Sequence, residues 1–160
     1  RYIMFLCVDL DDFNSEKILI NNKIKNNIIT NSFFYRLYYS DDEFISNGIV
    51  IVFKLYDVSF EKYFNKNKLI FGNNQKNIEN VNKLNILEDK LLKSLNLDKE
   101  KKCLIKEQLD NHFLKIINER NNQLKINKCC NIIIKISGIW ESKTEYGLTF
   151  RCIKTEKQYN

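Results

Sequence analysis

Two acidic clusters contain the residues whose types and spacing could support catalysis. Asp9, Asp11 and Asp12 follow the apolar run Ile3–Val8, and Tyr39–Asp42 has the order Tyr-x-Asp-Asp. Two-metal phosphoryl transfer requires carboxylates from separate strands that hold two ions about 4 Å apart. A polymerase palm with its fingers needs far more chain than 160 residues, and aspartate is common in turns because its side chain stabilises them. We therefore expect neither cluster to form a metal site.

Other catalytic and cofactor patterns are incomplete. His112 is the only histidine, so a His-based triad has at most one candidate base. Cys129 and Cys130 are adjacent, which is not a usual spacing for structural zinc, and the four glycines are isolated rather than grouped in a phosphate-binding loop. The five cysteines contain no C-x-x-C pair and are odd in number, a pattern typical of reduced thiols inside the cell. We expect no enzyme, no catalytic residue, no metal and no cofactor.

The last strand pair combines cations with aromatic side chains. Two strand-like runs, Ile132–Trp140 and Tyr146–Ile153, flank a polar turn over Glu141–Glu145. The turn has no Asn-Gly or Asp-Gly signal, so we expect a loop of several residues. Cations and aromatic faces along one hairpin are what a single-stranded nucleic acid needs. Bulky aromatic residues on a hairpin are also common in protein cores, so a structural interpretation stands beside this one.

The charge balance favours an anionic partner without identifying it. The net charge is +6 and the sequence pI is near 9.0, which raises the expectation of nucleic acid. The excess of Asn, Ile and Lys is equally typical of an AT-rich coding genome, and a solvated surface position is the default for each lysine. No apolar run approaches the roughly 18 residues of a membrane-spanning helix, so we expect no membrane association.

Hydrophobic runs predict the strands of the first half of the chain. A short buried strand is expected at Ile3–Val8 and a polar loop at residues 21–31. Ser32–Tyr39 and Gly48–Tyr56 are rich in aromatic and β-branched residues and predict a hairpin. Lys66–Phe71 predicts a third strand, which Gly72 ends.

The strongest helical pattern runs from Asn77 to Leu95. Asn77 can cap its start, and Lys93 suits the negative end of the helix dipole. Asp98–Lys102 predicts a charged turn, whereas Cys103–Arg120 fits either a helix or a strand. Apolar residues recur every three or four positions along the helix, which places them on one face: Ile78, Val81, Leu84, Leu87, Leu91 and Leu95.

The order of these elements predicts a β-rich α+β fold. Three strands, a helix at about residues 77–95 and a final hairpin match an OB-fold, a five-stranded Greek-key barrel with its helix between strands 3 and 4. We assign residues 32–154 to this OB-like domain. Residues 1–31 form an N-terminal strand and polar loop that can belong to the same domain, and residues 155–160 form a C-terminal tail.

Several segments resemble a protein family of large DNA viruses. They are FFYRLYYSDDEFISNGIVIVFKL, EKYFNKNKLIF, the EQL at Glu107–Leu109, and KISGIWESKTEYGLTF. The similarity covers most of the chain from Phe33 to Ile153, and its most specific part is G-I-W-E with Y-G-L-T at Gly138–Glu141 and Tyr146–Thr149. The family is that of OB-fold single-stranded DNA-binding proteins that serve genome replication.

The resemblance implies non-catalytic binding of single-stranded DNA, with RNA and an oligomeric state left open. It implies an intracellular site, the host cytoplasm or nucleus if the chain is viral, and replication or virion proteins as further partners. The alternative is a structural or scaffold subunit of a virion or replication complex, with its aromatic residues in the core or in a protein interface. The residues expected to bind nucleic acid are Tyr35, Arg36, Tyr38, Phe53, Lys54, Lys135, Trp140, Lys143, Tyr146, Phe150, Arg151 and Lys154.

Overall fold

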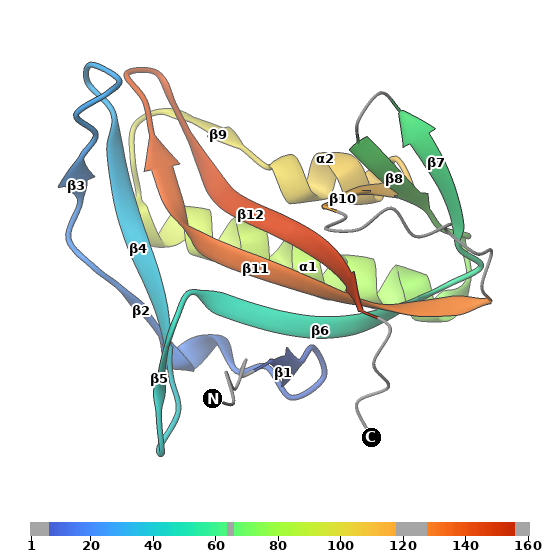
Figure 1. Cartoon of the computed structure of the whole chain (residues 1–160). Helices are drawn as coiled ribbons and strands as arrows, with labels where there is room; N and C mark the ends of the chain where they lie inside the picture. Colours follow the sequence, from blue (N-terminus) through green and yellow to red (C-terminus); the bar gives the residue numbers. More distant parts are fainter. Residues whose placement is uncertain (1–6, 64–65, 118–127, 156–160) are drawn as a thin grey trace, which may run out of the picture.

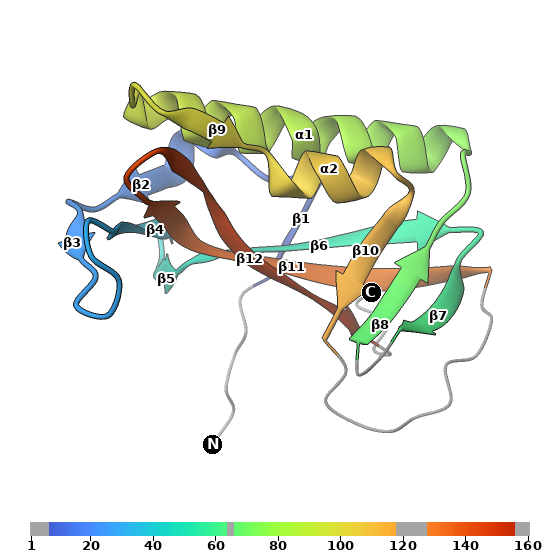
Figure 2. The same cartoon turned by 90° about the horizontal axis from the view of Figure 1, so that it is seen from above.

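The computed structural model describes residues 7–63, 66–117 and 128–155. They form a large mixed β-sheet with two α-helices on one side of its central strands (Figures 1 and 2). Neither described helix is both long and apolar enough to cross a membrane. The elements are β1 (Val8–Asp9), a 3-10 turn (Ser15–Lys17), β2 (Ile18–Ile20), β3 (Ile24–Lys25), β4 (Phe33–Ser40), β5 (Ile45–Asn47), β6 (Ile49–Tyr56), β7 (Ser59–Tyr63), β8 (Lys66–Ile70), α1 (Gln75–Leu95), β9 (Glu100–Lys102), α2 (Leu104–Asp110), β10 (Phe113–Ile116), β11 (Cys129–Glu141) and β12 (Glu145–Thr155).

Strand β11 is the centre of the sheet. Its antiparallel partner on one side is β12, as the predicted hairpin requires, with a short loop over residues 142–144. Its other edge pairs first with β6, over Cys129–Ile136, and then with β4, over Gly138–Glu141. The register with β12 shifts between Ile136 and Gly138, so Ser137 forms a β-bulge at the point where β6 gives way to β4.

The prediction of a five-stranded OB barrel is wrong. The described residues form one sheet of twelve strands, which is not closed. Seven of them follow the order β1-β6-β11-β12-β10-β8-β7. In addition, β4 pairs with β11, the short strands β2, β3 and β5 pair with β4, and β9 pairs with β12. The hairpin of Ser32–Tyr39 with Gly48–Tyr56 is also wrong, because β4 turns back as β5 and the chain then bends at Gly48, whose φ is +86°. After this bend β6 pairs with β11 instead of β4.

Short strands occupy segments for which the sequence predicted a loop or fitted both a helix and a strand. The polar segment 21–31 contains β3, and the predicted charged turn Asp98–Lys102 contains β9, which lies parallel to β12. The segment Cys103–Arg120 contains both alternatives, α2 and then β10. The strand expected at Ile3–Val8 lies mainly outside the described residues. The described strand β1 contains Val8 and ends at Asp9.

The long helix lies where its periodicity placed it. It runs from Gln75 to Leu95 and ends with Asn96 in the left-handed conformation. Its cap is Asn74, whose side chain accepts the backbone N–H of Asn77. Asn77 was predicted as the cap, but it is buried and instead donates to the carbonyls of Tyr56 and Gly72. Its amide therefore ties the helix start to the end of β6.

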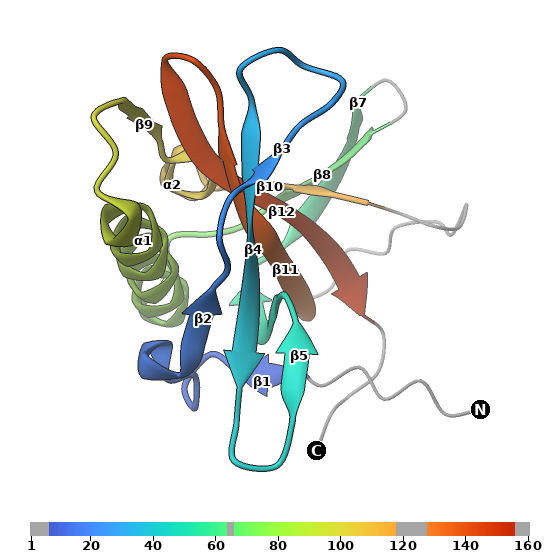
Figure 3. The same cartoon turned by 90° about the vertical axis from the view of Figure 1, so that its left-hand side faces the viewer.

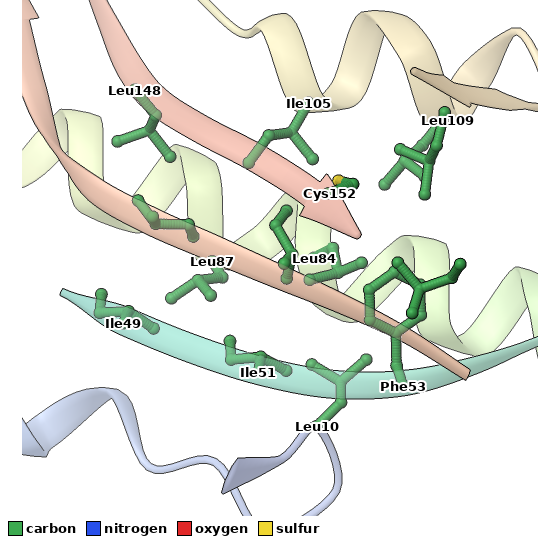
Figure 4. Close-up of a cluster of buried hydrophobic side chains, with 14 of the residues drawn as sticks. Leu10, Ile49, Ile51, Phe53, Leu84, Leu87, Ile105, Leu109, Leu148 and Cys152 are labelled. Carbon is green, nitrogen blue, oxygen red and sulfur yellow. The ribbon is translucent and has the colours of Figure 1, made fainter. Parts of the chain in front are cut away.

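The core fills the space between the sheet and the two helices. Leucines of α1, among them Leu84 and Leu87, pack against Ile49, Ile51 and Phe53 of β6 (Figure 4). Isoleucines at alternate positions of β11 bury the same face of the sheet; they are Ile132, Ile134 and Ile136. The opposite face of these central strands carries no described helix (Figure 2).

Helix α2 begins on a carboxylate from α1. Cys103 at its cap position makes no side-chain hydrogen bond. The buried side chain of Glu88 accepts the backbone N–H groups of Ile105 at 2.9 Å and Lys106 at 2.8 Å. Burial raises the pKa of Glu88, although the two N–H donors act in the opposite direction. This carboxylate thus performs for α2 the task of a local cap.

We predict that Glu88→Ala lowers the free energy of unfolding by about 2–4 kcal/mol, because the buried N–H of Ile105 and the partly buried N–H of Lys106 lose their acceptor. Urea denaturation followed by circular dichroism measures the change. Glu79→Ala is the matched control on the exposed side of the same helix, with an expected effect within about 0.5 kcal/mol. Equal effects of the two variants would show that Glu88 does not cap α2.

Candidate nucleic-acid interface

The bulge at Ser137 decides which side chains of β11 leave the core. Before it, even-numbered residues such as Ile136 point to the helices. After it, Ile139 and Glu141 are buried and Trp140 is partly exposed, so Trp140 lies on the outer face of the sheet. This is the face away from α1, which lies on one side of β4, β11 and β12 in Figure 3. Residues paired across neighbouring strands share a face, and the register brings Phe34 of β4 opposite Trp140.

Two aromatic rings lie on glycines of this outer face. A Cβ atom on Gly147 would come within 2.8 Å of Trp140 Cζ2, so the indole lies across β12 at that position. A Cβ atom on Gly138 would overlap the ring of Phe34. Both rings are partly exposed. Because the glycines have no side chains, atoms of each ring can approach the sheet closely at these positions.

Three cations lie on the strands that carry these rings and the glycines beneath them. Arg36 is the register partner of Gly138, and Lys135 is the direct partner of Arg151. None of the three forms an ion pair with a described residue. Like charges directly opposite each other on neighbouring strands destabilise a sheet. We call Phe34, Arg36, Lys135, Trp140 and Arg151 the aromatic–cation surface.

The lysines on the helical side of the molecule are arranged differently. Described residues form nine ion pairs, and the lysines of eight of them come from α1, α2, β9 and the segment between α1 and β9; the ninth joins Lys17 of the 3-10 turn to Asp41. Examples are Lys90 with Glu16 at 3.1 Å and Lys93 with Asp89 at 2.7 Å. Positive charge is therefore balanced locally near the helices and left unbalanced on the aromatic–cation surface.

A groove of about 870 Å³ adjoins this surface at the outer edge of β12. Trp140, Thr149 and Arg151 line it from the sheet, and Phe113 and Lys115 line it from β10. It exists because β12 is only partly covered on this side. Among the described strands, β9 pairs with Glu145–Gly147 and β10 with Cys152, which leaves residues 148–151 paired with β11 alone.

Burial removes three predicted aromatic residues from any stacking role. Tyr35, Phe53 and Tyr146 are 9%, 4% and 3% exposed and belong to the core. A base cannot reach a ring that protein atoms enclose. Tyr35 instead donates its hydroxyl to Glu141 Oε1 at 2.9 Å.

Glu141 is a buried carboxylate with two partners. It is 4% exposed, and Lys99 Nζ lies 2.8 Å from its second oxygen. Burial alone would raise the pKa of Glu141, but the bonds from Lys99 and Tyr35 outweigh burial and lower it. Burial, together with the bond to Glu141, raises the pKa of Tyr35 to about 12. This pair fixes β4 against the end of β11.

The other predicted residues are spread over several regions. Tyr38 and Phe150 are partly buried, Lys54 is exposed on β6, and Lys143 is exposed in the loop between β11 and β12. Lys154 Nζ lies 4.8 Å above the ring of Phe60, on the core side of the sheet. Sequence reasoning missed Phe34, Phe113, Lys66 and Lys115. The alternation of Phe34 with Arg36 was a visible signal for the first of these.

The two acidic clusters are not brought together as a metal site. Asp11 pairs with Lys83, and Asp41 lies 2.8 Å from Lys17 Nζ. Within residues 7–63, 66–117 and 128–155, no group of three or more His, Cys, Asp or Glu side chains has an arrangement that could hold a metal ion.

Comparisons with known proteins supply no family for this chain. Searches against protein-family models, curated proteins and solved structures found no match. The functional argument therefore depends on the residues themselves.

We predict that Tyr35→Phe reduces the loss of stability between about pH 10 and 12. In the wild type the unfolded state releases the tyrosine proton near pH 10, while the folded state holds it to about 12. Stability is thus lost as the pH rises through this window. Urea denaturation at pH 9 and pH 11.5 measures the difference, with Tyr38→Phe as control. A pH dependence identical in Tyr35→Phe and the wild type would contradict the role of Tyr35.

Proposed function

We propose that this protein binds single-stranded DNA, without catalysis, on the aromatic–cation surface. The observation that supports it is the grouping of three cations, each without an ion-pair partner among the described residues, around two rings that lie on glycines. A strand of nucleic acid supplies what this surface lacks. Its phosphates balance Arg36, Lys135 and Arg151, and its bases stack on Phe34 and Trp140.

The exposed ring faces favour a single strand over a duplex. Bases in a duplex are stacked on one another, so their faces cannot reach a side chain on a flat sheet. An unpaired base can, and each such stack contributes about 1–3 kcal/mol. Binding by stacking and phosphate contact is tolerant of sequence, because every base has an aromatic face.

We propose DNA rather than RNA as the ligand because the sequence resembles replication proteins of large DNA viruses. The segments that carry it include Gly138–Glu141 and Tyr146–Thr149, which contain Trp140 and both glycines beneath the rings. The OB barrel that the resemblance implied is replaced by an open sheet face. Genome replication and an intracellular site remain part of the proposal.

A scaffold subunit is the second candidate, and a separate observation favours it. Ile28 and Ile29, on the segment that joins β3 to β4, are 93% and 59% exposed, and Ile24 of β3 is 48% exposed. Exposed apolar groups of this kind are common at protein interfaces. Ile24 is the register partner of Phe34 and borders the aromatic–cation surface, whereas Ile28 and Ile29 lie between β3 and β4. Ile28 and Ile29 are therefore the positions at which this function can be tested separately.

We predict that oligo-dT changes the fluorescence of Trp140, the only tryptophan in the chain. The signal comes from the proposed site itself, so a titration reports binding there. Across a salt series, the three phosphate contacts on this surface contribute about −2 to the slope of log K against log salt, from roughly −0.7 for each contact on a single strand. No change of fluorescence and no binding at low salt would reject the proposal and favour the scaffold.

Removing the three cations should weaken binding and flatten the salt dependence. We expect Arg36→Gln/Lys135→Gln/Arg151→Gln to reduce the magnitude of the slope by about 2, measured by anisotropy of labelled oligo-dT. The control Lys90→Gln/Lys93→Gln/Lys106→Gln removes the same charge from ion-paired positions on the helices. Equal losses in both variants, or equal affinity for duplex DNA, would indicate only a generic basic protein.

Truncating the indole tests stacking separately from charge. We predict that Trp140→Ala weakens oligo-dT binding roughly 5- to 150-fold, the equivalent of about 1–3 kcal/mol, with the salt slope unchanged. Phe44→Ala, which removes a partly buried ring from the turn before β5, is the control. Thermal unfolding of both variants shows whether the fold is kept. An unchanged affinity in folded Trp140→Ala would exclude stacking at this position.

A further inference from the structure

We infer that the bound strand continues past Arg151, over the uncovered edge of β12, into the groove in front of β10. This inference rests on the proposed function and extends it to residues that the sequence did not single out. The ligand it specifies is a single strand long enough to cover both the aromatic–cation surface and the groove. Arg151 joins the two parts, because it belongs to the surface and also lines the groove.

The uncovered edge of β12 offers backbone hydrogen-bonding groups to the groove. The carbonyl of Cys152 accepts the N–H of Ile117, so the backbone of Cys152 faces β10. Alternate residues of a strand direct their backbone groups to the same side, and Phe150 therefore faces the groove. Its N–H and C=O have no strand partner there among the described residues. These groups can pair with the edge of an unpaired base.

The far wall of the groove repeats the charge pattern of the aromatic–cation surface. Lys68 of β8 and Lys115 of β10 are direct register partners, again two like charges opposite each other. Lys68 Nζ lies 4.1 Å above the ring of Phe113, and Phe113 lines the groove together with Lys115 and the exposed Lys66.

Acidic residues near this wall leave its positive charge in excess. Glu107 of α2 lines the groove, and Glu61 of β7 is the other register partner of Lys68. Neither forms an ion pair with a described lysine or arginine. The groove is lined by Lys66, Lys115 and Arg151 against the single carboxylate of Glu107. This excess suits phosphate groups.

The sheet sets the length of strand that this path needs. From Arg36 on β4 the path crosses β11, β12 and β10 to Lys66 on β8, which are four steps between neighbouring strands. At about 4.8 Å for each step the path measures at least roughly 19 Å, because Arg36 and Lys66 also differ in level along the strands. A strand with bases about 3.4 Å apart needs at least roughly six or seven nucleotides to cover it. A trinucleotide covers less than half.

The experiment compares dT3 and dT12 as competitors of labelled dT12, for the wild type and for Lys66→Gln/Lys115→Gln. We expect the double variant to bind dT12 roughly 10- to 30-fold more weakly near 0.1 M salt and to lose about 1.4 from the log–log slope, as two phosphate contacts require. Its quenching of Trp140 at saturation should remain, because the aromatic–cation surface is intact. Lys90→Gln/Lys93→Gln is the control with the same change in charge.

The outcomes separate the two proposals. If dT12 binds to the wild type and Lys66→Gln/Lys115→Gln leaves affinity and slope unchanged, the strand does not enter the groove, although the proposed function stands. The same conclusion follows if the control variant loses as much as the double variant, or if dT3 competes as well as dT12. If neither oligonucleotide binds the wild type at low salt, the proposed function itself fails.

Discussion

The β-bulge at Ser137 is the constraint on which the rest of the structure depends. One extra residue in β11 reverses the alternation of its side chains, so Trp140 faces outward and Glu141 inward. The same point divides the edge of β11 between β6 and β4. The inward carboxylate then needs Lys99 and Tyr35, because a buried charge without partners is costly. One local irregularity thereby creates both the buried ion pair and the outer aromatic ring.

The distribution of ion pairs gives the two sides of the molecule different electrostatic characters. Exposed ion pairs contribute little to stability, at most about 1 kcal/mol each, so those on the helices are weak evidence for a stabilising role. Their effect on the field around the molecule is larger, since they cancel positive charge where it occurs. Lys135 and Arg151 are not cancelled in this way by described residues. An approaching polyanion is therefore attracted to the sheet rather than to the helices.

Local patterns in the sequence predicted the elements, whereas pairings between distant segments were out of reach. Helix α1 follows from its apolar repeat, and the β11–β12 hairpin follows from its β-branched runs. The OB barrel failed because element order does not determine which edges pair. Nothing near Gly48 in the sequence shows that β6 will join β11, and the three residues of β9 have no strand-like pattern. Their pairing depends on β12, more than 40 residues away.

The sequence predicted a site of cations and aromatic rings, but it did not predict which aromatic residues face outward. The glycines beneath the rings help to explain the difference. An aromatic residue on a strand has one ring and two possible faces of the sheet, and a bulge that the sequence does not reveal decides between them. Tyr35 and Tyr146 fell on the core side, and Trp140 on the other. Gly147 and Gly138 then distinguish a platform from an incomplete core. A core ring packs between two layers, whereas Phe34 and Trp140 each contact a glycine and stay partly exposed, and an exposed ring is what stacking on a base requires.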